Sequence, residues 1–467
     1  MLKESRRVIH ERIFRAYQIL YHDRIDEHVE ILARHAREAA LGSLAVDYLD
    51  RAARKAVQVS RHSQAIVFIQ EALTVLTEAD AGNEGTELEL RLLLRIAFNA
   101  VGNYRARLPN LDRAELLAER LGRISVIPEI MISRASVLLQ LGQGRRALRM
   151  CADVHQSAHL ESDLDTAIAA GYMHSRCLFY NGHIRQALTI AAETLALLEA
   201  NETTCRHGGA FGSTQVMLLT QISQAQACLG NSADAIAAGD AALRLASAGK
   251  RNWDIELASY GLAIAHLYSG DLEVTASVLE HALAISELEE SASSIVGQLA
   301  GLLGYAYVRS GRPQQGLELC CRALEHREES YHHRNWTRLC CAALLREAGY
   351  AEQARSLAQE AATQAKRWNY PVHAAWSEVL LAELLEDTNA EHAVNHAERA
   401  LRISQPLQLR PFVTRAVAIR SRVGSGTSGG PISPVKSRPY LSDLSPVHWR
   451  GNEAPTSSLI SVVGFPK

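Results

Sequence analysis

The sequence has few aromatic residues and almost no net charge. Phe, Trp and Tyr make up 6% of its 467 residues, and the formal net charge is −2. A nearly neutral chain argues against a large nucleic-acid surface. No apolar run approaches the roughly 20 residues of a membrane-spanning helix, and the first twenty residues lack the apolar stretch of a secretory signal. We therefore expect a cytoplasmic protein that binds neither nucleic acid nor membrane.

Motifs of catalysis are also missing. The nearest approach to a phosphate-binding loop, Ala248-Gly249-Lys250, lacks the first Gly and the closing Ser or Thr. There is no G-x-S-x-G elbow and no strand followed by a Gly-rich dinucleotide loop. The sequence thus predicts a chain that is not an enzyme, with no catalytic residue and no cofactor.

Cysteine and histidine offer no convincing metal site. The doublets Cys320-Cys321 and Cys340-Cys341 lack C-x-x-C spacing and lie in apolar helical runs, so we expect small buried side chains. His392 and His396 have i, i+4 spacing, which fits a helix face better than a ligand set in the absence of HExxH. We interpret His332-His333 as part of a solvated loop and predict no metal.

An internal repeat is the main positive signal. Six segments align without gaps and recur about every 40 residues. They are ASVLLQLGQGRRAL (135–148), SRCLFYNGHIRQAL (175–188), SQAQACLGNSADAI (223–236), AIAHLYSGDLEVTA (263–276), GYAYVRSGRPQQGL (304–317) and AALLREAGYAEQAR (342–355).

Small residues and glycine hold fixed positions in this repeat. Each segment begins with a small residue, has Gly seven positions later and a second small residue five positions further on. Such a Gly ends a helix by taking a left-handed conformation at little cost. The small residues let two helices cross closely, where a larger side chain would cost about 1–3 kcal/mol. We therefore predict helix pairs whose apolar faces must stack on neighbouring pairs.

The pattern resembles the tetratricopeptide repeat, in its long-helix form of about 40 residues. The resemblance implies an all-α, right-handed superhelical solenoid of antiparallel helix pairs. We expect a helical junction or N-terminal cap over 1–60, eight or nine helix pairs over 60–405, and a terminal helix or cap over 406–423. Residues 424–467 contain half of the twelve Pro and several Gly, which predicts a disordered tail.

The N-terminal region carries a second resemblance. His10, Asp23-Arg24, Glu27-His28, the Leu32-Ala33-Arg34-His35 run and Ala52-Ala53 are similar to the junction that precedes the repeats in bacterial signalling ATPases, including those fused to class III adenylate or guanylate cyclases. The resemblance implies that the array is the sensor half of such a system, without its catalytic parts.

Function by this interpretation is binding. In tetratricopeptide arrays the first helix of each pair lines the concave surface, where Tyr and Arg are favoured contact residues. We predict a protein or peptide segment in that groove, and an ATPase or cyclase as a second partner. The predicted contact residues are Arg176, Tyr180, Gln224, Tyr268, Tyr305, Arg309 and Arg346.

Two alternatives remain open. One is a truncated C-terminal portion of an adenylate or guanylate cyclase with its ATPase. The other is the sensor half of a LuxR-type transcription activator, which requires a helix-turn-helix domain that the tail after residue 421 does not supply.

Overall fold

A computed structural model describes residues 2–59, 61–78, 83–201, 212–287, 295–326 and 330–424. The regular elements in these ranges are all helical, and the ranges contain no strand. None of the described helices is long and apolar enough to cross a bilayer. The predicted tail lies outside the described residues apart from Gly424, the last residue of the final helix.

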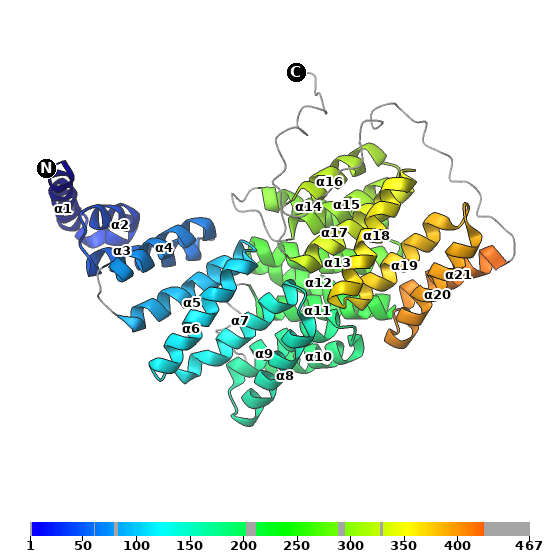
Figure 1. The fold of residues 1–467 in the computed structure, drawn as a ribbon, viewed down its shortest axis with the longest axis horizontal. Coiled ribbons are helices and arrows are strands. Elements are labelled where there is room, and N and C mark those ends of the chain that lie inside the picture. The colour runs from blue at the N-terminus through cyan, green and yellow to red at the C-terminus, as the bar shows by residue number, and fades with distance from the viewer. Residues whose placement is uncertain are drawn as a thin grey trace, which may run out of the picture. The chain divides into compact units, whose positions relative to one another are not determined.

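The chain forms a tetratricopeptide-like solenoid (Figure 1). Most helices pack against the next helix of the chain, and in most pairs the first helix also contacts the first helix of the following pair. The α-helices are α1 Leu2–Leu20, α2 Val29–Glu38, α3 Ser43–Gln58, α4 His62–Glu78, α5 Glu84–Ala100, α6 Tyr104–Arg120, α7 Ile127–Gln140, α8 Gly144–Leu160, α9 Leu164–Tyr180, α10 Ile184–Ala200, α11 Thr214–Leu229, α12 Ser232–Gly249, α13 Asn252–Ser269, α14 Leu272–Glu287, α15 Val296–Arg309, α16 Pro313–Glu325, α17 Tyr331–Glu347, α18 Ala351–Trp368, α19 Pro371–Leu385, α20 Ala390–Leu407 and α21 Arg410–Gly424. Short 3₁₀ helices cover His22–Glu27 and Ile124–Val126.

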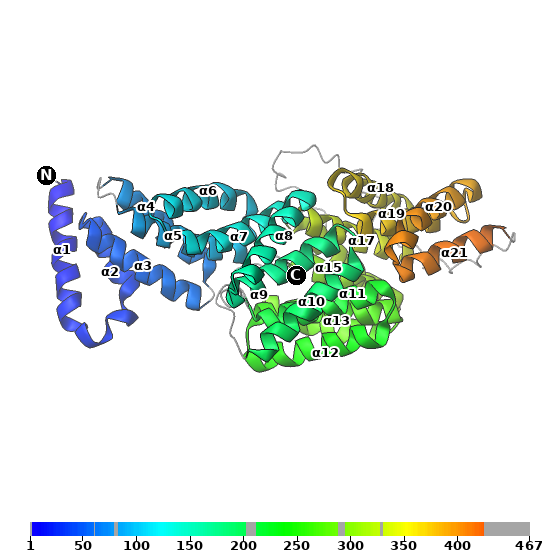
Figure 2. The ribbon, with the colours of Figure 1, turned by 90° about the horizontal axis from the view of Figure 1, so that it is seen from below.

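The predicted role of the repeat glycines is confirmed. All six have a positive φ, between 77° and 90°, one or two residues after the end of the first helix of a pair. An L-residue with a side chain is strained in this region, whereas glycine is not. The left-handed residue ends the helix and turns the chain into its antiparallel partner, which Figure 2 shows for α9 and α10.

The predicted small residues lie at helix crossings and are buried. Ala187 and Ala354 are completely inaccessible to solvent. At Gly304 an added Cβ would lie 2.9 Å from the carbonyl oxygen of Gly316, and the reverse distance is 2.7 Å. The two backbones therefore touch directly, and this crossing of α15 and α16 has no room for a side chain.

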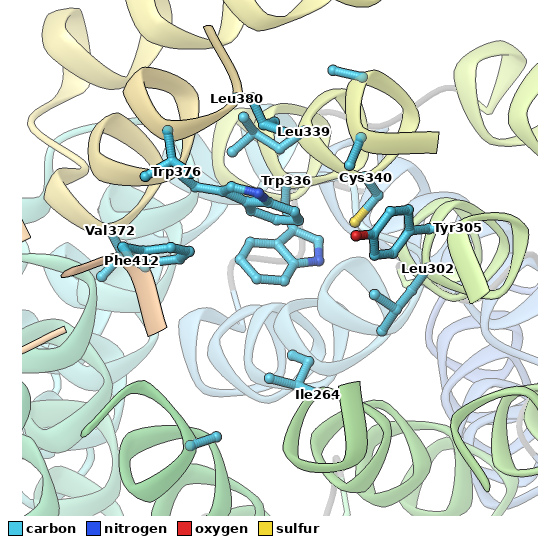
Figure 3. Packing of buried hydrophobic residues seen from close by; sticks show 14 of the residues in the cluster. Ile264, Leu302, Tyr305, Trp336, Leu339, Cys340, Val372, Trp376, Leu380 and Phe412 are labelled. Atoms are coloured by element: carbon cyan, nitrogen blue, oxygen red, sulfur yellow. The ribbon is translucent and has the colours of Figure 1, made fainter. Parts of the chain in front are cut away.

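The largest apolar core runs from α9 to α21 and is built mainly from the first helices of the pairs. Figure 3 shows Trp336 at its centre, with Trp376 and Phe412 on one side and Tyr305 on the other. The Trp336 and Trp376 ring centroids are 4.8 Å apart. A separate core joins α1 to α5 around Phe14.

The array also folds back on itself. The Tyr370 hydroxyl donates a 2.8 Å hydrogen bond to the carbonyl oxygen of Leu139. Two similar approaches occur further along: a Cβ added to Gly182 would lie 2.6 Å from Pro371, and one added to Gly230 would lie 2.8 Å from Arg410. We call these contacts the closure. In the second and third contacts, the turn after a first helix meets the start of the first helix five pairs later, and in the first contact the last turn of α7 meets the residue that precedes α19.

Candidate functional site: the interior cavity

The inner faces of several helices, mostly the first of their pairs, line a cavity of about 130 Å³. Its wall is formed by α5, α6, α7, α9, α11, α13, the start of α15 and α17. Helix caps position two parts of this wall. The Ser213 hydroxyl accepts the backbone N–H of Val216 and begins α11, and the Ser330 hydroxyl accepts that of His333 and begins α17.

Three arginines face the cavity, with Glu129 as the one carboxylate among the described lining residues. Arg95 is buried, forms an ion pair with Glu129 and donates to the Ser133 hydroxyl at 2.9 Å. Arg107 is buried and donates to the side chain of Asn99. Burial lowers the pKa of Arg107 to about 9, and the positive charge of Arg95 acts in the same direction.

Arg176 is held by two tyrosines. Its guanidinium donates to the Tyr172 hydroxyl at 3.1 Å and to the Tyr180 hydroxyl at 3.4 Å. The same group lies 5.8 Å and 5.6 Å from the centroids of these two rings. The tyrosines orient the guanidinium without neutralising it, because both partners are uncharged hydroxyls.

Uncharged polar groups complete the wall. The Thr214 and Thr220 hydroxyls, the Gln221 amide nitrogen and the Gln298 amide oxygen are buried and have no hydrogen-bond partner among the described residues. All four residues line the cavity. A buried polar group without a partner costs about 1–3 kcal/mol and calls for an explanation.

Beyond Tyr180 and Tyr260 lies a smaller space of about 20 Å³. The His332 ring lies 3.9 Å from that of Tyr180 and 4.5 Å from that of His373, between ring centroids. Burial lowers the pKa of His332 well below its ordinary value and that of His373 to about 3. Both rings are therefore neutral at pH 7.

Some of the predicted contact residues meet at these two spaces. Arg176, Tyr180 and Gln224 line the main cavity, and Tyr268 lines the smaller space with Tyr180 and Gln224. Within the part of the chain that the structure describes, the buried Tyr268 hydroxyl has no hydrogen-bond partner.

The other three predicted residues border neither space. Tyr305 is buried in the large core, and the exposed Arg309 donates to its hydroxyl at 3.0 Å. Arg346 forms ion pairs with Glu347 and Glu383. A role in binding a partner stays a prediction for all seven residues.

Sequence reasoning missed Arg95, Arg107, Gln221 and Gln298. The helical register offered a partial signal. Thr220 lies one turn before the predicted Gln224, and Tyr172 lies one turn before Arg176, so extending the register toward each helix start finds more of the wall. No repeat position marked Arg107, because it belongs to the second helix of its pair.

The interpretation of His332-His333 as a solvated loop is wrong. Both residues are buried in the first turn of α17, because the Ser330 cap starts the helix directly before them. The expectation for the cysteine doublets is confirmed for Cys320, Cys340 and Cys341 and wrong for Cys321, which is exposed because it lies on the outer face of α16.

The histidines at i, i+4 are engaged locally. The Nδ1 atom of His396 lies 2.7 Å from a carboxylate oxygen of Glu378, and His392 contacts the Asn389 cap of its own helix. Within the described ranges, no group of three or more His, Cys, Asp or Glu side chains is arranged to hold a metal ion.

No protein-family model matches the chain, and no curated protein matches it. Solved structures do align. A Rap protein complexed with the competence and sporulation factor is 14% identical, with a TM-score of 0.49 over 81% of this chain and 99% of that one. NprR in complex with its cognate peptide NprX is 13% identical, with a TM-score of 0.47 over 73% and 98%. The APC/C heterotetramer Cut9–Hcn1 is 12% identical, with a TM-score of 0.45 over 80% and 76%. Similarity at this level decides nothing about a ligand.

Proposed function

We propose that this chain is a non-catalytic sensing module whose ligand occupies the interior of the helical array. The observation that carries the proposal is a set of four buried residues, on α11 and α15, that line one cavity and that each have a polar side-chain atom without a hydrogen-bond partner among the described residues. A ligand that these side chains turn to meet supplies the missing hydrogen bonds, which would otherwise cost the fold free energy.

The size of the cavity limits the occupant. It measures about 130 Å³, close to the roughly 150 Å³ of an engineered cavity that takes up benzene. The closed array therefore takes a small molecule, or a single side chain of a peptide, in its interior.

A bulky side chain introduced into the cavity tests whether a ligand binds there. Met217 is buried in the cavity wall, whereas Leu116 is exposed on α6. We expect at least one compound from a small panel of cations, neutral molecules and anions to raise the melting temperature of the wild type and Leu116→Trp, but not that of Met217→Trp. Native mass spectrometry checks the stoichiometry, and circular dichroism checks that each variant is folded. A panel without any stabilising compound would contradict the proposal.

We further propose that the array passes the state of its interior to a protein or peptide partner. Arg309 is a candidate contact, because it is exposed and its guanidinium is oriented by Tyr305. A pull-down should capture less partner with Arg309→Ala and Tyr268→Ala combined than with Arg244→Ala, which removes an exposed arginine on α12. Equal capture would remove these residues from the interface.

The N-terminal resemblance supports an ATPase or cyclase as that partner or as a fused domain. The DNA upstream of the coding sequence separates the alternatives. An in-frame phosphate loop and cyclase domain would favour the cyclase alternative, whereas a helix-turn-helix domain encoded in the same frame would favour the transcription activator.

A further inference from the structure

The charges that face the interior cavity are unbalanced. Arg95, Arg107 and Arg176 line it, and Glu129 is the one carboxylate among the described lining residues. Glu129 is engaged with Arg95. Asp254, on α13 next to this wall, already accepts the backbone N–H of Ser213 with both oxygens, at 3.0 and 3.1 Å. Among the described residues the wall therefore carries more arginines than carboxylates, in surroundings where burying charge is costly.

Arg176 is the guanidinium best placed to meet an anion. Its two hydrogen bonds go to the Tyr172 and Tyr180 hydroxyls and use two of its five N–H groups. The tyrosines fix its plane, so little side-chain freedom is lost on binding. A planar guanidinium held in this way suits carboxylate and phosphate oxygens, which it can bind through two parallel hydrogen bonds.

The uncharged polar groups that have no partner among the described residues also favour an anion, as Arg176 does. The Gln221 amide nitrogen is a donor, and the Thr214 and Thr220 hydroxyls can donate, so three of the four atoms suit the oxygens of an anion. The fourth, the Gln298 amide oxygen, accepts. An occupant that satisfies the whole set carries an O–H or N–H in addition to its acidic group.

The remaining wall is apolar. Ile132, Met173, Met217 and Leu257 line the same cavity as the arginines. Methionine and aliphatic side chains favour a carbon skeleton over bare hydrated ions. With about 130 Å³ available, the space suits a molecule of roughly six to ten non-hydrogen atoms.

We infer that the interior cavity is a site for a small organic anion, a carboxylate or phosphate ester with an apolar body and one hydrogen-bond donor, held through Arg176. This inference rests on the interior binding proposed above and adds the chemical class of the ligand. Carboxylate and phosphate share the recognition chemistry, and only measurement separates them.

Four probes of similar size test the inference on the full chain by isothermal titration calorimetry. They are 4-hydroxybenzoate, 3-hydroxypropyl phosphate, the neutral 4-hydroxybenzamide and the cationic 4-hydroxybenzylamine. At least one of the two anions should bind with one-to-one stoichiometry, and at least tenfold more tightly than the amide or the amine. Arg176→Gln should weaken that binding at least tenfold, while Arg176→Lys keeps a charge and should lose less. Arg244→Gln is the matched surface control and should leave binding unchanged.

Gln221→Leu provides a second variant for the calorimetric test if Arg176→Gln does not fold. It removes one donor at nearly constant volume and should weaken the anion more than the amine. Amide or amine binding equal to that of the anions would overturn the anion class and leave interior binding standing. Unchanged anion affinity in folded Arg176→Gln would likewise overturn the role of Arg176. Binding of none of the four probes, with no stabilising compound in the wider panel, would remove both proposals.

Discussion

The hydroxyl of Tyr370 donates a 2.8 Å hydrogen bond to the backbone carbonyl of Leu139, a residue 231 positions earlier in the chain. Tyr370 caps the start of α19, and Leu139 belongs to the last turn of α7. Nearby, the Ser330 hydroxyl donates to the Gln140 side chain at 2.5 Å. These contacts fasten the closure beside the cavity, since Gln140 also lines it.

Removing the Tyr370 hydroxyl should loosen the closure. We expect Tyr370→Phe to lower the free energy of unfolding by about 0.5–1.5 kcal/mol, the net value of one buried hydrogen bond. Tyr350 occupies the same capping position in α18, and its side chain makes no capping hydrogen bond within the described part of α18. Urea denaturation of Tyr350→Phe is therefore the matched control, and equal losses would deny the hydrogen bond a contribution. Faster amide exchange around residues 139–143 should accompany the loss in Tyr370→Phe alone.

Substitutions at two glycines with the same φ distinguish the cost of backbone strain from the cost of disturbing the closure. Gly142 and Gly311 both have φ of +80°. A Cβ added to Gly142 would collide with the ring of Trp368, whereas one added to Gly311 would meet none of the described residues within 4 Å. Gly311→Ala should cost about 1–2 kcal/mol from the left-handed conformation alone. Gly142→Ala should cost a further 1–3 kcal/mol or so from overpacking. Equal unfolding free energies of the two variants would show that the Trp368 side chain moves aside without a cost in stability.

Acid should destabilise the array through its buried histidines. Burial lowers the pKa of His373 from 6.5 to about 3 and that of His332 well below 6.5. Between these values the unfolded chain binds protons that the folded chain does not, so stability rises with pH across this window. Above about pH 6.5 the neutral histidines cost the folded state nothing. As the pH falls toward 3, each histidine lowers the free energy of unfolding, in total by about 1.4 kcal/mol for each unit between its pKa values in the unfolded and the folded chain.

Denaturation at several pH values checks this expectation. His373→Asn should flatten the dependence between pH 6.5 and 4.5, because it removes one titrating ring and keeps an acceptor near the Asn335 amide, 3.2 Å from His373 Nδ1. His392→Asn changes an exposed histidine on α20 and should keep the wild-type slope. Identical slopes in the two variants would rule out His373 as the source.

The carboxylate of Glu383 should contribute more to the free energy of unfolding than a carboxylate on the surface does. It accepts two hydrogen bonds from Arg415, at 2.9 and 2.8 Å, and pairs with Arg346. Burial opposes ionisation, yet these two arginines hold the pKa of Glu383 below its ordinary value. Glu383→Gln should cost about 2–3 kcal/mol, because two arginines lose their charged acceptor.

The exposed pair of Glu352 and Arg355 provides the comparison. Glu352→Gln should change the unfolding free energy by less than about 0.5 kcal/mol. Chemical denaturation measures both variants. A cost for Glu383→Gln as small as that for Glu352→Gln would show that the Arg346 side chain is free for a partner, as the sequence predicted, rather than fixed in the fold.

The sequence by itself determined the repeating unit. The positions of the six glycines predicted six left-handed turns, and the small residues predicted close crossings such as that of Gly304 with Gly316. The turns and the crossings both depend on contacts between segments that are neighbours in the sequence. A repeat of about 40 residues therefore contains the residues that make them.

Only the tertiary structure decided which of these units meet again. Gly142 and Gly311 are alike in the sequence and in φ, but only Gly142 lies against another part of the array. The closure arises because the small rotation between successive helix pairs accumulates along a solenoid, and no single repeat encodes the sum. The same accumulated curvature brings Arg107 of α6 and Gln298 of α15 to one cavity, although nothing in the local pattern links them.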